Sequence, residues 1–71
     1  MNQTELLLLE DLLDKEIGRL TKDLRKNAKH REIWISTGRD LFYIDRQKQS
    51  LEYRLEVANE TLTKLTEWSN N

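Results

Sequence analysis

The chain has 71 residues, of which 35% are charged and 37% hydrophobic, and its formal net charge at pH 7 is −1. This length holds one domain at most, and a single core in so short a chain seldom supplies more than about 3–5 kcal/mol of stability. The absence of cysteine excludes disulfides, a thiol nucleophile and thiolate metal sites.

The first predicted helix covers residues from about 4 to 35. Thr4, followed by Glu5, has the residue type of a helix N-cap. A hydrophobic stripe then steps alternately by three and four residues, which is the spacing of a helix that lays one narrow seam against another helix. Its members are Leu13, Ile17, Leu20, Leu24, Asn27, Arg31 and Trp34.

The segment 36–38, Ser-Thr-Gly, is the predicted turn. Gly38 can take the left-handed conformation that ends a helix. Thr37 and Asp40 have the spacing of a capping box for the next helix, with Asp in place of the usual Glu. Extending the first stripe past this point would put one glycine and two acids on the seam. A hairpin is therefore favoured over the alternative, one continuous bent helix that dimerises along its length.

The second predicted helix covers residues from about 39 to 68, and its stripe has the same spacing as the first. Its members are Leu41, Ile44, Lys48, Leu51, Leu55, Ala58, Leu62 and Leu65. Folding at the glycine brings the two stripes into register, with Trp34 opposite Leu41, Arg31 opposite Ile44, Asn27 opposite Lys48 and Leu13 opposite Leu62. The sequence thus predicts an all-α, coiled-coil-like antiparallel two-helix hairpin, one domain over residues 1–71.

The end of the hairpin away from the turn carries more apolar residues than one hairpin can bury. Four successive leucines start at Leu6, and successive residues of a helix point in different directions around its axis. Two hairpins packed as an elongated four-helix bundle would bury them. We therefore expect a homodimer. The residues expected at its interface are Leu6, Leu8, Leu9, Leu12, Leu65 and Trp68.

A cationic stripe follows the first helix on the side opposite its seam. It consists of Lys15, Arg19, Lys22, Lys26 and Lys29. Charge is also segregated along the chain, with a net −4 over residues 1–18, +5 over residues 19–49 and −2 over residues 50–71. Such a stripe can stay solvated, meet an acidic protein surface or the acidic half of a second copy, or neutralise the phosphates of a nucleic acid.

An aromatic and basic tip is expected at the turn end of the hairpin. It combines Trp34, Arg39, Phe42 and Tyr43, and Tyr53 lies further along the outward face of the second helix. Tyrosine, tryptophan and arginine are the residue types favoured at binding hot spots. The alternative is that the same residues close the end of the hairpin inside a dimer.

The chain lacks the patterns of an enzyme, a cofactor site or a membrane span. The single histidine, His30, has no companion ligands at metal-site spacing, and no glycine-rich phosphate loop is present. The N-terminus has no signal-peptide pattern, and no apolar run approaches the roughly 20 residues that cross a bilayer. We therefore expect a cytoplasmic, non-enzymatic protein without cofactor or membrane contact.

In size and predicted fold the chain resembles small plasmid and sporulation regulators that dimerise as four-helix bundles. It carries none of their residue motifs, and the Ser-Gln-x-x-Asp run of the sporulation phosphatases is absent. Small, charged helical proteins without cysteine are also common products of phages and mobile elements, and many of them block a host protein. The predicted function is a protein–protein interaction module, acting as a regulator, inhibitor or adaptor on one partner with an acidic or apolar surface. The alternatives are a nucleic-acid-binding accessory protein and a structural oligomerisation part.

Overall fold

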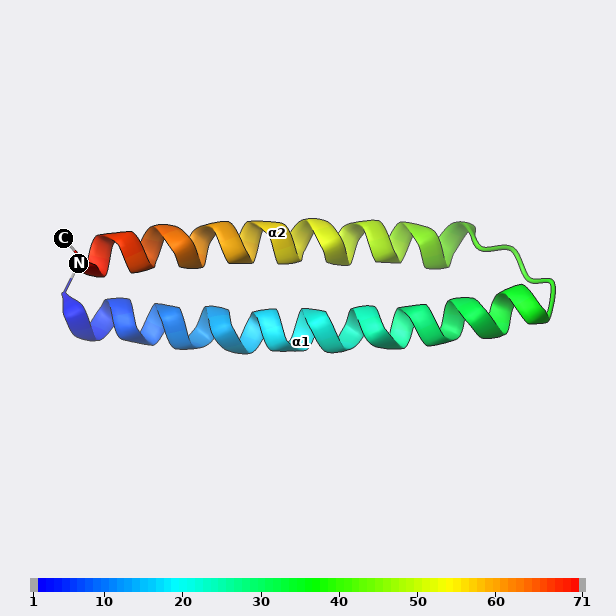
Figure 1. Cartoon of the computed structure of the whole chain (residues 1–71), viewed down its shortest axis with the longest axis horizontal. Helices are drawn as coiled ribbons and strands as arrows, with labels where there is room; N and C mark the ends of the chain where they lie inside the picture. The colour runs from blue at the N-terminus through cyan, green and yellow to red at the C-terminus, as the bar shows by residue number, and fades with distance from the viewer. Residues whose placement is uncertain (1, 71) are drawn as a thin grey trace.

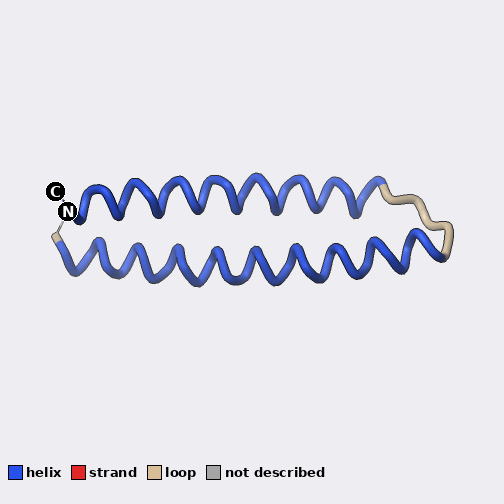
Figure 2. The backbone as a smooth tube through the Cα atoms, in the orientation of Figure 1, coloured by secondary structure: helices blue, strands red, loops and turns tan. Residues whose placement is uncertain are grey.

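The structure, a computed structural model, describes residues 2–70 as two antiparallel helices joined by a short loop (Figure 1). Helix α1 spans Gln3–Ser36 and helix α2 spans Phe42–Asn70. The Cα atoms fill a rod of 53 × 14 × 13 Å, with the loop at one end and both chain ends at the other (Figure 2). The predicted all-α hairpin is confirmed, and no strand occurs within residues 2–70.

Helix α1 begins slightly earlier than predicted, because Asn2 and not Thr4 is its N-cap. Asn2 has an extended backbone, and its Oδ1 accepts a hydrogen bond of 2.8 Å from the N–H of Glu5. Its Nδ2 donates in turn to the Glu5 carboxylate at 3.2 Å. Asparagine satisfies a free N–H of the first helical turn at least as well as threonine does. With its cap at Asn2, the helix begins at Gln3.

Helix α1 ends at the predicted place, and the end involves a glycine as expected. Thr37 closes the helix, since its N–H and its hydroxyl both donate to the carbonyl oxygen of Ile33 at 3.0 Å. Gly38 follows with a φ of +71°, the only positive φ among the described residues. A side chain at this φ would meet a steric penalty that glycine avoids. The predicted left-handed glycine is confirmed.

The start of α2 differs from the prediction. The connection covers residues 37–41 instead of 36–38, and α2 begins at Phe42 instead of residue 39. The capping box predicted for Thr37 and Asp40 is wrong, because the Thr37 hydroxyl is used by the preceding helix. Asp40 contacts the start of α2 without Thr37, and its Oδ1 accepts a hydrogen bond of 3.0 Å from the N–H of Phe42.

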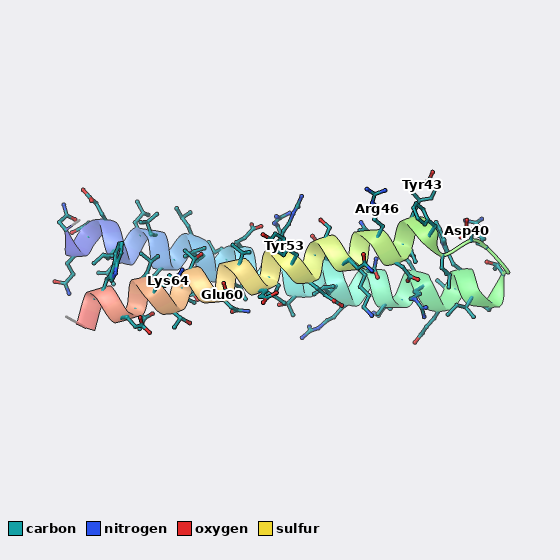
Figure 3. The ribbon with its side chains drawn as sticks, turned by 90° about the horizontal axis from the view of Figure 1, so that it is seen from above. Asp40, Tyr43, Arg46, Tyr53, Glu60 and Lys64 are labelled. Atoms are coloured by element: carbon teal, nitrogen blue, oxygen red, sulfur yellow. The ribbon has the colours of Figure 1, made fainter. Side chains whose placement is uncertain are left out.

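The interior of the hairpin is one seam with a seven-residue repeat. The two helices cross at a shallow angle in Figure 3, as expected when ridges of side chains at i±3 pack into grooves at i±4. The buried residues of the seam are Leu6, Leu20 and Asn27 of α1 and Ile44, Leu51, Ala58 and Leu65 of α2. Ile17, Leu24, Leu55 and Leu62, which lie between them in the repeat, are half-buried. Most of the predicted seam is therefore confirmed.

The turn half of the seam is polar, as predicted, but its polar residues have other partners than the predicted ones. Asn27 Nδ2 donates to the carbonyl oxygen of Ile44 at 2.9 Å and to Gln47 Oε1 at 3.0 Å. Arg31 Nε donates to Asp45 Oδ1 at 2.8 Å. Asn27 was expected opposite Lys48 and Arg31 opposite Ile44. The contacts with Gln47 and Asp45 lie one residue from these positions, in opposite directions along α2, and the contact of Asn27 with Ile44 lies four residues away.

Lys48 stands at a seam position by its spacing, but its side chain does not pack in the interior as predicted. The residue is exposed, and its Nζ lies 3.8 Å from a carboxylate oxygen of Glu52 one turn further along α2. Burying an ammonium group without a close partner costs more free energy than leaving it in water. The flexible side chain of lysine allows its charged end to reach the solvent while its stem stays near the seam.

Candidate interaction surfaces

The open end of the rod exposes most of the leucines that were expected at a dimer interface. Leu8, Leu12 and Trp68 are 59%, 53% and 61% exposed, and Leu9 is 37% exposed. Leu6 and Leu65 are different, because the seam of the single hairpin already buries them to 7% exposure. The expected interface set is thus divided, and only its four exposed members are available to a second molecule.

The cationic stripe is exposed along its whole length, but its two halves differ in pairing. Lys15 Nζ lies 3.0 Å from Asp11 Oδ2, and Arg19 Nε donates to Glu16 Oε2 at 3.1 Å. Within the described part of the chain, Lys22, Lys26 and Lys29 make no ion pair. The unpaired positive charge therefore lies in the half of α1 that leads to the turn.

The pairing of Arg19 also affects the pKa of its partner. Hydrogen bonds from Arg19, with a smaller attraction from Arg54 of the other helix, hold the pKa of Glu16 below its usual value. Arg19 extends toward Asp23 as well, with 3.9 Å between Nη1 and Oδ2. Arg54 reaches this region because Asp23 and Arg54 line the same shallow groove. Charges of the two helices are thus brought together on one side of the rod.

The predicted aromatic tip is assembled from two neighbouring contacts. The Arg39 guanidinium lies 5.6 Å from the centre of the Trp34 ring system. The rings of Phe42 and Tyr43 are 5.4 Å apart in an edge-to-face arrangement. A groove lined by Trp34 and Tyr43 joins the two contacts. Phe42 and Tyr43 are 57% and 75% exposed, whereas Trp34 is half-buried.

Tyr53 lies apart from the tip. It projects from the middle of α2 and is 68% exposed (Figure 3). Ten residues separate it from Tyr43, which corresponds to about 15 Å along a helix. The structure therefore does not bring all the sequence-predicted partner residues into one cluster.

Three residues extend these surfaces beyond the sequence-based prediction. Arg46 lies with its guanidinium 6.0 Å from the centre of the Phe42 ring and projects beside Tyr43 in Figure 3. Its position four residues after Phe42 on one helix is the sequence signal that predicts this contact. Ile33 and Ile35, both more than 50% exposed, add apolar surface at the turn end.

The described residues hold no group of three His, Asp or Glu side chains placed as metal ligands. No helix within residues 2–70 has the length and the apolar content needed to cross a membrane. Compared with models of protein families, with curated proteins and with solved structures, the chain matches none.

Proposed function

We propose that the chain is a non-enzymatic protein–protein interaction module whose hairpins dimerise into an elongated four-helix bundle and act on a partner protein. The observation that carries this proposal is the apolar surface left open at both ends of the rod. Leu12 and Trp68 at one end, and Ile33, Phe42 and Tyr43 at the other, are all more than half exposed. Contiguous apolar surface of this kind on a small protein is typical of an interaction site.

The total accessible surface supports the same proposal. It is 5797 Å², whereas a compact monomer of this mass is expected to expose about 4,700 Å². A two-helix rod has a single seam and only six buried hydrophobic residues among those described, so it cannot reduce this area by itself. A second protein surface that packs on the rod can cover part of this accessible area.

The unpaired lysines of α1 define the partner that we propose for the assembled module. Lys22 and Lys29 are exposed, make no ion pair within residues 2–70, and lie on the side of α1 opposite the seam. Two helical turns separate them, about 10 Å. Fixed positive charge on a rigid helix complements an acidic protein surface and accelerates encounter with it. We propose that a regulator, inhibitor or adaptor of this design binds an acidic partner through these lysines and contacts it with Phe42 of the aromatic tip.

The same lysines support a second candidate function, binding to nucleic acid in the role of an accessory protein. Contacts of lysine with phosphate release counterions and therefore weaken steeply as salt rises. The net charge of −1 opposes this candidate, because the acidic open half would repel the same ligand. A purely structural oligomerisation part, without any further partner, is the third candidate.

The first prediction concerns the dimer. Leu12→Glu is expected to convert the dimer to a monomer, because it puts a charge into an interface that must be desolvated. Leu12 is 53% exposed in the hairpin, so the folded monomer itself should tolerate the change. Sedimentation velocity measures the mass, and circular dichroism checks that the helix content is retained. An unchanged dimer mass would contradict this role for Leu12.

The second prediction concerns binding of the partner protein. The tagged chain is used to capture partners from a bacterial lysate, with and without nuclease and at two salt concentrations, beside the variant Lys22→Glu/Lys29→Glu. A single protein bound by the wild type despite nuclease, and lost by the variant, is the expected result. The matched control is Lys48→Glu/Lys64→Glu, which changes the net charge equally at two exposed lysines of α2 outside the tip, and Phe42→Ala tests the tip.

The other outcomes favour the other candidates. Recovery of nucleic acid that disappears with nuclease or high salt would replace the proposed function with the nucleic-acid candidate. Equal loss of the protein in both charge variants would show that net charge, and not the face of α1, governs binding. Recovery of the tagged chain alone would favour the structural part.

A further inference from the structure

The two long sides of the hairpin differ in how their residues are paired. On one side, the helices are linked across the seam by the ion pair of Arg31 with Asp45, and Lys48 pairs with Glu52 in the same groove. On the other side, Asp23 of α1 lines a groove with Tyr43 and Arg54 of α2, and no ion pair among the described residues joins the helices there. We name this second side the docking face.

The docking face also holds most of the exposed apolar surface. Residues that alternate by three and four share one side of a helix. By this spacing Asp23 shares its side of α1 with Leu9, Leu12 and Ile33, and Tyr43 shares its side of α2 with Val57 and Trp68. Of the eleven large hydrophobic side chains exposed in the described part of the chain, these are six: Leu9, Leu12, Ile33, Tyr43, Val57 and Trp68.

The apolar residues of the docking face form two patches at its opposite ends. Leu9, Leu12 and Trp68 lie at the open end, and Ile33 and Tyr43 lie at the turn end. Twenty-four residues, about 36 Å of helix, separate Leu9 from Ile33. A second copy laid on this face in the reverse direction places each patch against the other patch, whereas a small ligand would cover only one of them.

The charged residues between the patches fit the same arrangement. When two copies of α1 cross midway between Arg19 and Asp23, three of the four opposed pairs on the docking face match in chemistry, apolar with apolar or acid with base. The opposed pairs are Leu9 with Ile33, Leu12 with His30, Glu16 with Lys26 and Arg19 with Asp23. A shift of one heptad would instead set Leu12 against Asp23 or Ile33 against Glu16. The register is therefore specified by both apolar and charged pairs.

We propose that the dimer forms through the docking face, with the two hairpins antiparallel, the α1 helices crossing between Arg19 and Asp23 and the α2 helices crossing at Arg54. This inference rests on the dimer of the proposed function and adds its interface and direction. The acidic open half, net −4 and −2 over its two segments, then lies on the basic turn half, net +5, of the other copy. A parallel dimer would place halves of equal sign together, which is unfavourable.

The size of the docking face agrees with a stable dimer. The Cα atoms of the rod extend over 53 × 14 Å, which is room for an interface of standard size, about 800 Å² on each copy. The residues at its centre, Glu16, Arg19 and Asp23, are already paired in the single chain. Their charges are therefore partly compensated before the second copy arrives.

Disulfide trapping tests the direction directly, because the natural chain contains no cysteine. The variant Leu12→Cys/His30→Cys is oxidised under mild conditions and run on a non-reducing gel. Its two cysteines are about 27 Å apart on one helix and cannot join within a chain. The expected result is a covalent dimer of twice the 8.5 kDa chain mass in most of the protein. A mixture of the single variants Leu12→Cys and Lys64→Cys, opposed only in a parallel dimer, should stay below one tenth cross-linked.

The outcomes separate this inference from the proposed function. If the mixture of Leu12→Cys and Lys64→Cys gives more covalent dimer than the double variant, the antiparallel direction is wrong. A wild type that sediments as a dimer while neither pair is trapped would overturn the docking face and leave the dimer intact. A wild type that sediments as a monomer would overturn this inference together with the dimer of the proposed function.

Discussion

Leu20→Ala is expected to unfold most of the protein at room temperature. Leu20 is the most buried side chain of the hairpin, at 1% exposure, and it lies in the apolar half of the seam. Truncation of a buried leucine to alanine costs about 2–5 kcal/mol, from lost transfer free energy and the cavity that remains. A chain of this length has about 3–5 kcal/mol in total, so one substitution removes most of its stability.

The measurement is thermal unfolding followed by circular dichroism at 222 nm, at one fixed protein concentration because dimerisation raises the apparent Tm. A loss of this size corresponds to a fall in Tm of roughly 10–30 °C for a chain this short. Leu7→Ala is the matched control. It makes the same chemical change on the same helix at a side chain that is 58% exposed and outside the expected dimer interface, where about 0.5 kcal/mol or less is expected. Equal effects of the two substitutions would show that the seam does not carry the stability.

The hairpin and its seam were predictable from the sequence because they depend on a repeated pattern. A stripe that steps by three and four residues specifies one face of a helix wherever it occurs, and a break in phase beside Gly38 specifies where the chain folds back. Leu20, Leu51 and Ala58 are buried for that reason. No single residue has to be interpreted correctly for the pattern to hold.

The ends of the helices and the exposure of Lys48 were not predictable in this way. The helix ends depend on which of two nearby residues makes a hydrogen bond, and the exposure of Lys48 depends on the direction that its side chain takes. Asn2 and Thr4 can both cap a helix, and only the observed hydrogen bond to Glu5 decides between them. Thr37 can end one helix or begin the next, and its hydroxyl bonds backward. Lys48 stands at a seam position, but its long side chain lets the charge leave the interior.

The candidate surfaces were predicted less completely than the seam, since exposure depends on both helices. Leu6 and Leu65 have the same residue type as Leu8, yet the seam buries the first two and leaves the third in solvent. Sequence spacing alone identifies neighbours on one helix, such as Phe42 and Arg46. The groove that joins Trp34 to Tyr43 crosses between the helices and requires the register of the hairpin.

Asn27→Leu is expected to stabilise the fold and to weaken its specificity. Asn27 is the one buried polar residue among those described, at 3% exposure. Its Nδ2 donates to Ile44 O and Gln47 Oε1, while its buried Oδ1 has no partner among the described residues. An unsatisfied buried polar atom costs about 1–3 kcal/mol. Leucine removes that atom and adds apolar contacts, so a gain of about 1–2 kcal/mol is expected in urea unfolding.

The loss of specificity follows from the same hydrogen bonds. A single asparagine in a coiled-coil seam selects the register that pairs it and disfavours the others. In this chain the selected register is the one that places Asn27 against Ile44 and Gln47 of α2. With leucine there, neighbouring registers and larger assemblies become nearly equal in free energy. Sedimentation should therefore show a mixture of masses for Asn27→Leu and a single mass for the wild type.

Asn27→Asp distinguishes the hydrogen bonds from the shape of the side chain. Aspartate has nearly the same volume, but its carboxylate cannot donate to Ile44 O or Gln47 Oε1 and would bury a charge beside two acceptors. A loss of more than about 2 kcal/mol is expected at pH 7. A wild-type unfolding curve for Asn27→Asp would show that the seam opens to water at this layer. Register selection would then have to come from the ion pair of Arg31 with Asp45.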